Sequence, residues 1–120
     1  MKLLIVDDSK AMRMIVRKTL RQAGYANLDV AEAANGKEAF DLLMQGGADL
    51  VLSDWNMPEM TGIELLSKLN SDGVKVKFGF VTSEGTSEMR ERAKQEGALF
   101  LIAKPFTVEA FQEALGPVMK

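Results

Sequence analysis

Acidic, hydroxyl and amine side chains follow four apolar runs of this sequence, and their types suit a divalent cation and a phosphoryl group. The residues that end the four runs are Asp7 with Asp8, Asp54, Thr82 and Lys104. Carboxylate oxygens are the ligands that Mg²⁺ prefers, and Mg²⁺ commonly also binds phosphate oxygens. A carboxylate can attack phosphorus to give an aspartyl-phosphate, while a metal ion and a lysine neutralise the charge. Phosphoryl transfer to an aspartate is therefore a chemistry that this set could perform.

The four runs lie at residues 3–6, 50–53, 78–81 and 99–103. Apolar runs of this length, bounded by polar residues and separated by helical patterns, are typical of buried strands in a parallel sheet. In such sheets the ligand site lies beyond the carboxyl ends of the strands. The strand ends should therefore bring the carboxylates, the hydroxyl and the amine to one edge of the sheet.

Along the whole chain, strand patterns alternate with helix patterns, which predicts βαβ units with right-handed crossovers. We predict an α/β fold, a three-layer sandwich around a doubly wound, five-stranded parallel sheet of the flavodoxin-like kind. The predicted strands cover about residues 2–7, 28–33, 49–53, 75–81 and 99–103. The predicted helices, caps included, cover about 9–20, 35–44, 62–69, 86–96 and 107–115. Periodicity alone does not specify the order of the strands.

The composition fits one domain over residues 1–120 and excludes several chemistries. A chain with 47% hydrophobic residues can bury a core, and its net charge of -2 argues against a dedicated nucleic-acid surface. No apolar stretch approaches the roughly 20 residues that span a bilayer. The absence of cysteine and histidine excludes disulfides, thiolate chemistry, histidine-ligated zinc and a Ser-His-Asp triad. We therefore expect a cytoplasmic protein without membrane or nucleic-acid partners.

Each candidate residue also has a simpler structural interpretation. An aspartate after a strand commonly caps the next helix, which is the favoured interpretation of Asp7 and Asp8 taken alone. Thr82 can be an ordinary strand residue, and Lys104 can shield a strand edge. Asp54 changes the balance, because three carboxylates at one edge repel one another unless a cation offsets them. Taken together, the residues favour a functional site.

The chain resembles the receiver domain of two-component response regulators over essentially all of its 120 residues. The resemblance rests on an ordered set of motifs, namely Val6-Asp7-Asp8-Ser9, residues 53–58 with Thr61-Gly62, residues 81–84, and Lys104-Pro105-Phe106. The stretch Ser-Asp-Trp-Asn-Met-Pro at 53–58 is most similar to CheY-like single-domain chemotaxis regulators. This resemblance implies a sheet with the strand order 2-1-3-4-5.

The resemblance implies a role for each acidic residue of the set. Asp54 would be the phosphoacceptor and would also ligate Mg²⁺. Asp8 and the backbone carbonyl of Asn56 would complete the direct protein ligands, while Asp7 would act mainly through water. The implied cofactor is therefore Mg²⁺, bound by oxygen ligands alone.

The same resemblance assigns roles to residues on the later strands and loops. Lys104 would pair with the phosphoryl oxygens, and Thr82 would move to hydrogen-bond them after phosphorylation. The Lys104-Pro105 peptide bond is cis in the family. Asn56 and Glu84 match positions that influence the rate of dephosphorylation.

Two positions depart from the pattern of the family or of an ordinary strand. Three residues before the conserved lysine the family usually has Tyr or Phe, where this chain has Leu101. Phe100 would lie on the opposite face of the strand, so it is not a simple substitute. We expect phosphotransfer to survive this change. In the family, however, the aromatic side chain at this position turns inward when the threonine moves, and Leu101 has no aromatic ring to do so. Gly79 removes a packing side chain from the fourth strand, which either leaves space or is filled by a neighbouring phenylalanine.

The resemblance implies a signalling switch, not an enzyme that acts on other substrates. Its partners would be a histidine kinase, a downstream target such as the flagellar motor switch, and a phosphatase, with the chain itself a monomer. A chemotaxis switch competes here with a phosphorelay shuttle, a phosphate sink and a receiver cut from a larger regulator. Outside this class stand a Mg²⁺-dependent phosphatase and a pseudo-receiver that only binds partners. The phosphatase would need a general acid where Asn56 stands, and the complete residue set argues against the pseudo-receiver.

Overall fold

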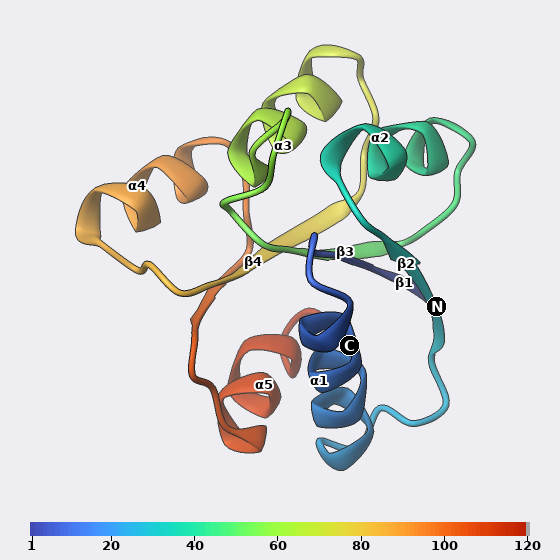
Figure 1. The fold of residues 1–120 in the computed structure, drawn as a ribbon, viewed down its shortest axis with the longest axis vertical. Helices are drawn as coiled ribbons and strands as arrows, with labels where there is room; N and C mark the ends of the chain where they lie inside the picture. The colour runs from blue at the N-terminus through green and yellow to red at the C-terminus, as the bar shows by residue number, and fades with distance from the viewer. Residues whose placement is uncertain (120) are drawn as a thin grey trace.

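The computed structural model describes residues 1–119, which form one parallel sheet with helices on both faces (Figure 1). The strand order is β2-β1-β3-β4-β5, which confirms the predicted fold class. The strands are β1 (Lys2–Val6), β2 (Asp29–Ala33), β3 (Leu50–Ser53), β4 (Lys77–Thr82) and β5 (Leu101–Ala103). The helices are α1 (Lys10–Gln22), α2 (Gly36–Met44), α3 (Gly62–Ser71), α4 (Ser87–Gln95) and α5 (Val108–Leu115).

Two apolar layers hold the sheet between the helices. Helices α2, α3 and α4 cover one face, while α1 and α5 cover the other (Figure 1). Along β1, Leu4 and Val6 belong to the first layer, and Leu3 and Ile5 belong to the second. All four side chains are buried, because a parallel sheet covered on both faces has no solvent-facing side.

The start of each helix is fixed close to a strand end by a capping side chain. In every helix the residue before the first turn accepts a hydrogen bond from the backbone N–H three positions later. These caps are Ser9, Asn35, Thr61, Thr86 and Thr107. Thr61 also forms a capping box with Glu64. Short strand-to-helix connections therefore keep the residues after the strands close to the carboxyl edge of the sheet.

The last strand is shorter than predicted. The apolar run at 99–103 predicted a buried strand, whereas β5 begins at Leu101 and Leu99 is 52% exposed. Since β5 lies at the edge of the sheet, its first residues receive less cover than those of a central strand. The fourth strand is shifted along the chain: it begins at Lys77, two residues after the predicted start, and ends at Thr82, one residue beyond the predicted end.

Gly79 of β4 faces a phenylalanine and not an empty space. A Cβ atom built at Gly79 would lie well under 3.0 Å from the ring carbons of Phe100. The ring of Phe100 therefore fills the gap in the strand, which decides between the two interpretations that the sequence left open. Within residues 1–119, no helix has the length and apolar character that crossing a membrane requires.

Candidate functional site

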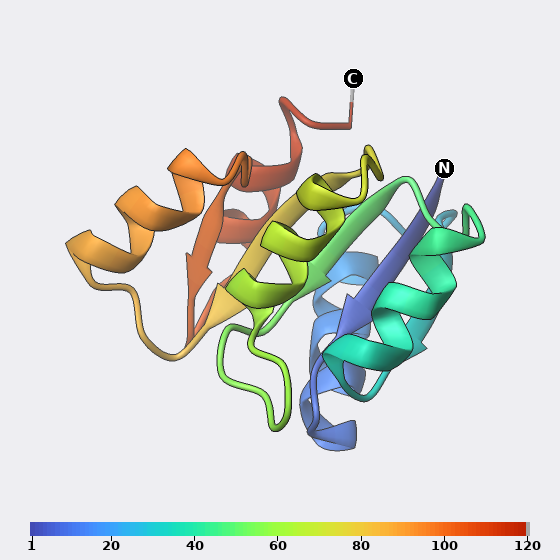
Figure 2. The same ribbon diagram turned by 90° about the horizontal axis from the view of Figure 1, so that it is seen from above.

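The arrows of the strands end at one edge of the sheet, its carboxyl edge (Figure 2). Three carboxylates meet there. Val6 and Ser53 are partners in the register of β1 and β3, so the residues that follow them leave the sheet side by side. Asp7, Asp8 and Asp54 each offer an oxygen, and these oxygens lie within 4.8 Å of one another. Asp7 is buried and Asp8 is exposed. The three predicted acidic residues are therefore brought together in one cluster, open to solvent on the side of Asp8.

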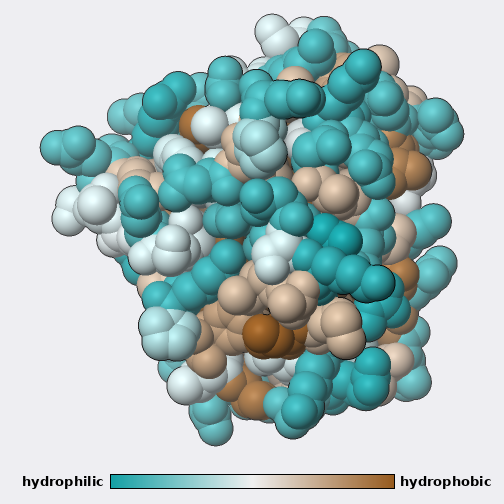
Figure 3. Space-filling model, in the orientation of Figure 1, coloured by the Kyte–Doolittle hydropathy of each residue, from teal (hydrophilic) through white to brown (hydrophobic). Residues whose placement is uncertain are grey.

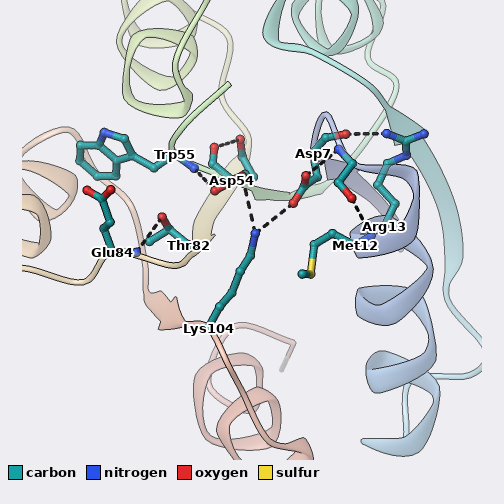
Figure 4. Close-up of polar contacts among 10 residues, drawn as sticks. Asp7, Met12, Arg13, Asp54, Trp55, Thr82, Glu84 and Lys104 are labelled. Atoms are coloured by element: carbon teal, nitrogen blue, oxygen red, sulfur yellow. Dashed lines mark hydrogen bonds and ion pairs between the residues drawn. The ribbon is translucent and has the colours of Figure 1, made fainter. Parts of the chain in front are cut away.

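Lys104 reaches the same cluster from the segment after β5 (Figure 4). Its ammonium group lies 3.2 Å from Asp7 Oδ2 and 3.6 Å from Asp54 Oδ2. The backbone N–H of Lys104 donates to the carbonyl of Thr82 at 2.7 Å, which holds the residue at the end of β4. The Lys104-Pro105 bond is cis, as the resemblance implied. One ammonium group thus bridges two carboxylates from different strands.

The charge of the cluster fits a bound divalent cation. Three carboxylates face one ammonium group, so two negative charges remain without a partner in the cluster. Oxygen ligands with uncompensated negative charge are the donor set that Mg²⁺ selects. Asp7 and Asp54 already contact Lys104, which leaves Asp8 and the outer oxygens of the cluster available to a hydrated ion.

Burial raises the pKa of the Asp54 carboxyl above its ordinary value. The charge of Lys104 and hydrogen bonds from the Trp55 and Asn56 backbone act in the opposite direction, while the charge of Asp7 adds to the increase. The Trp55 N–H donates to Asp54 Oδ1 at 2.8 Å. Asp54 is therefore oriented by its own backbone turn, and a cation beside it would favour the ionised, nucleophilic form.

The turn after Asp54 is anchored by two buried apolar side chains. Trp55 packs on Phe80 with 4.8 Å between ring centroids, and Met57 is buried beside it in the same core layer. Asn56 lies between them and is exposed. This alternation presents Asn56 to solvent next to the cluster, and its role as a metal ligand through the carbonyl stays a prediction.

Thr82 lies at the same edge, and its hydroxyl is engaged by the following loop. The residue is fully buried, and its Oγ1 accepts a hydrogen bond from the backbone N–H of Glu84 at 3.3 Å (Figure 4). In this conformation the oxygen holds the start of the loop between β4 and α4. The expected movement of this hydroxyl toward a phosphoryl oxygen stays a prediction.

Gly62 positions the acceptor, a role that sequence reasoning did not assign. Its N–H donates to the carbonyl of Trp55 at 2.7 Å, and an added Cβ atom would collide with the carbonyl oxygen of Asp54. Only a residue without a side chain lets α3 begin this close to the backbone of Asp54. The sequence signal was the Thr61-Gly62 pair, which a helix cap alone also explains.

Arg13 is a second positioning residue that the sequence did not reveal. Its Nη1 donates to the backbone carbonyl of Asp7 at 2.5 Å, and its Nε donates to Glu32 of β2 at 2.8 Å. Arg17 holds the other oxygen of Glu32 at 2.9 Å. Glu32 lies nineteen residues after Arg13 in the sequence, so this contact exists only after β1 and β2 have paired.

We expect Glu32→Gln to reduce stability by roughly 1 kcal/mol at neutral pH, a small value because the pair is partly exposed. Burial raises the pKa of Glu32, but the hydrogen bonds and charges of Arg13 and Arg17 outweigh it and hold the pKa below its ordinary value. Because the pKa of Glu32 is lower in the folded protein than in the unfolded chain, the ionised carboxylate stabilises the fold. This stability is present above the unfolded-state pKa and is lost as the pH falls through the folded-state pKa. Urea unfolding across the acid range should therefore show the two proteins converging at low pH. Glu91→Gln, an exposed change on α4, is the control, and a difference that persists in acid would contradict the assignment.

Comparison with known proteins agrees with this geometry. The model of the response regulator receiver domain family matches residues 3–116. The chain is 41% identical to the chemotaxis protein CheY1 of Helicobacter pylori, with 99% of this chain and 97% of that protein covered. It is 40% identical to the CheY homolog of Campylobacter jejuni subsp. jejuni, covering 99% and 92%.

The chain belongs to the response regulator receiver domain family. The crystal structure of Vibrio cholerae CheY4 superimposes on this receiver domain with a TM-score of 0.84 at 33% identity, covering 98% of this chain and 97% of that one. The resemblance drawn from the sequence motifs is thereby confirmed. The receiver domain is that of a CheY-like response regulator in two-component signalling, a class that in general works with a histidine kinase and a downstream protein.

Proposed function

We propose that this receiver domain takes a phosphoryl group from a histidine kinase onto Asp54 and thereby changes its binding to a downstream protein. The observation that carries the proposal is the bridge of Lys104 between Asp7 and Asp54, with Asp8 beside them. A purely structural cluster would pair its charges, whereas this one has three carboxylates for one ammonium group, and Asp8 is exposed to solvent.

Each residue has a task in the transfer. An Oδ atom of Asp54 attacks phosphorus, the bond between phosphorus and the donor nitrogen breaks, and the donor leaves with the electron pair. Lys104 Nζ neutralises the phosphoryl oxygens, and the Thr82 hydroxyl donates to one of them. Asp8, Asp54 and the Asn56 carbonyl would hold Mg²⁺ directly, and Asp7 would hold it mainly through water; the bound ion would supply positive charge to the transferring group.

Two further features support a switch over an enzyme with other substrates. Asn56 occupies the position where an aspartyl phosphatase would need a general acid, and an amide cannot donate a proton in that role. The full set of Asp7, Asp8, Asp54, Thr82 and Lys104 at one edge supports an active receiver over one that only binds partners.

We propose chemotaxis as the pathway, with a cytoplasmic monomer acting on a motor component. The support comes from the Helicobacter and Campylobacter relatives, which are chemotaxis proteins matched over nearly their whole length.

An apolar patch lies below the hydrophilic centre of the carboxyl face, over α1 and α5 (Figure 3). Helix α1 carries the exposed side chains of Met14 and Ile15, which gives the phosphodonor an apolar surface to contact.

Intact mass after incubation with acetyl phosphate and Mg²⁺ tests the function. We expect one added phosphoryl group, and none when EDTA removes the metal. A mass unchanged in both conditions would leave rapid hydrolysis as one explanation, and beryllofluoride distinguishes it. If the fluorescence of Trp55, the sole tryptophan, also does not respond to beryllofluoride with Mg²⁺, the proposed phosphoacceptor function is wrong.

A further inference from the structure

Helix α4 is attached to the body of the protein by few buried side chains. Ala93 is its buried residue, and Met89 is partly buried. At its C-terminal end, Asn70 of α3 donates a hydrogen bond to the carbonyl of Glu96 at 2.7 Å. At its N-terminal end the corresponding attachment is made by Arg90. The position of α4 therefore depends strongly on polar contacts at its two ends.

Arg90 connects the loop before α4 to the edge strand of the sheet. Its Nε donates to the carbonyl of Gly85 at 3.2 Å, and its Nη1 donates to the carbonyl of Leu101 in β5 at 3.4 Å. The carbonyl of Phe100, the residue before β5, faces β4, since it accepts from the N–H of Phe80, and carbonyls alternate in direction along a strand. The Leu101 carbonyl thus points away from the ladder, and Arg90 covers a polar group of the exposed sheet edge.

The loop at Gly85 packs directly against β5. A Cβ atom built on Gly85 would lie 3.2 Å from Arg90 Nη2, 3.6 Å from Leu101 Cδ2 and 3.7 Å from the Cβ of Ala103. The same loop is held at its other end by Thr82, whose hydroxyl oxygen accepts from the N–H of Glu84. One short segment therefore links the hydroxyl at the site to the guanidinium on β5.

We propose that Arg90 is a strap that couples the position of the Thr82 hydroxyl to β5 and α4. When the hydroxyl leaves the Glu84 N–H, the loop loses its attachment, the Gly85 carbonyl moves, and the bridge from Gly85 to Leu101 opens. Leu101 itself has no polar atom in its side chain, so it cannot make such a link. The departure of Thr82 toward a phosphoryl group rests on the proposed function, whereas the strap itself does not.

The first test needs no phosphoryl group. Thr82→Val keeps the shape of the side chain and removes the hydroxyl, so it should release the Glu84 N–H and open the strap. We expect the NMR methyl signals of Leu101 to shift in Thr82→Val relative to wild type. In the Arg90→Met protein, Thr82→Val should shift these signals by less than half as much. In the control protein Arg92→Met, which changes an exposed residue of the same helix, Thr82→Val should shift them by the full amount. Equal shifts in all three backgrounds would overturn the proposal.

The second test asks whether the strap opposes activation. Since its bonds belong to the unmodified form, Arg90→Met should bind beryllofluoride about threefold to tenfold more tightly than wild type, measured by Trp55 fluorescence with Mg²⁺. Arg92→Met should match wild type. If wild type responds and Arg90→Met binds no more tightly, the strap does not oppose activation and the proposal is wrong. If no variant responds while the methyl coupling is present, the strap stands and the phosphoacceptor function fails.

Discussion

Asp54→Asn will take up no phosphoryl group from acetyl phosphate under conditions in which wild type is modified. The amide nitrogen replaces the attacking oxygen, and the neutral group is a poor nucleophile. The fold should remain intact, because the substitution keeps the shape of the side chain and removes one of three carboxylates that repel one another. Intact mass and thermal unfolding measure both expectations, with the labelled fraction falling to background and the midpoint equal to wild type or higher.

The control for this substitution lies beyond the opposite end of the same strand. Asp49 immediately precedes β3 at its opposite end, where its Oδ2 accepts from the Lys2 N–H at 2.8 Å. Asp49→Asn should therefore be phosphorylated like wild type. Labelling that survives in Asp54→Asn would show that another residue is the acceptor, and loss of labelling in Asp49→Asn would show that the assay reports the fold and not the site.

Gly79→Val will destabilise the protein by about 3 kcal/mol, because its side chain must occupy the volume of the Phe100 ring. The chain offers little room to relax, since β4 is a central strand flanked by β3 and β5. For a domain of this size the loss corresponds to a fall of about 10 °C in the unfolding midpoint. Urea and thermal unfolding give the two values.

A double-mutant cycle identifies the cause of that loss. Phe100→Ala alone should also destabilise, by roughly 2 kcal/mol, because it leaves Gly79 uncovered. The pair Gly79→Val with Phe100→Ala should be more stable than the sum of the two losses by at least about 1 kcal/mol, since valine then fills the space that the ring left. Additive losses would show that Gly79 is required for some other reason, such as its backbone.

Much of this fold was predictable from the sequence because strand and helix signals are local. A run such as Leu3-Leu4-Ile5-Val6 indicates a strand buried on both faces, and capping residues such as Thr61 mark where helices begin. The rule that ligands bind at the carboxyl ends of parallel strands then placed Asp7, Asp54 and Lys104 at one edge. The boundaries of β5 were less accurate, because the cover of an edge strand depends on neighbours that the run itself does not specify.

The candidate site was predicted in its chemistry and only partly in its geometry. The acidic residues and Lys104 were identifiable as a set, because helix capping and edge protection explain each of them alone but not three carboxylates and a lysine at one sheet edge. Arg13 and Gly62 were not, because an arginine on a helix and a glycine after a threonine have common surface and capping roles. Their contacts with the backbone of Asp7 and Asp54 appear only when separate elements are packed together.

The sequence by itself determined which side chains end the strands and that they can hold a cation and a phosphoryl group. The tertiary structure decided that Lys104 bridges Asp7 and Asp54, that Phe100 fills the space at Gly79, and that Arg90 spans a loop and a strand. The physical reason is the distance along the chain over which each kind of interaction acts. Periodicity and capping act within a few residues, whereas these contacts depend on the order and register of strands that are distant along the chain.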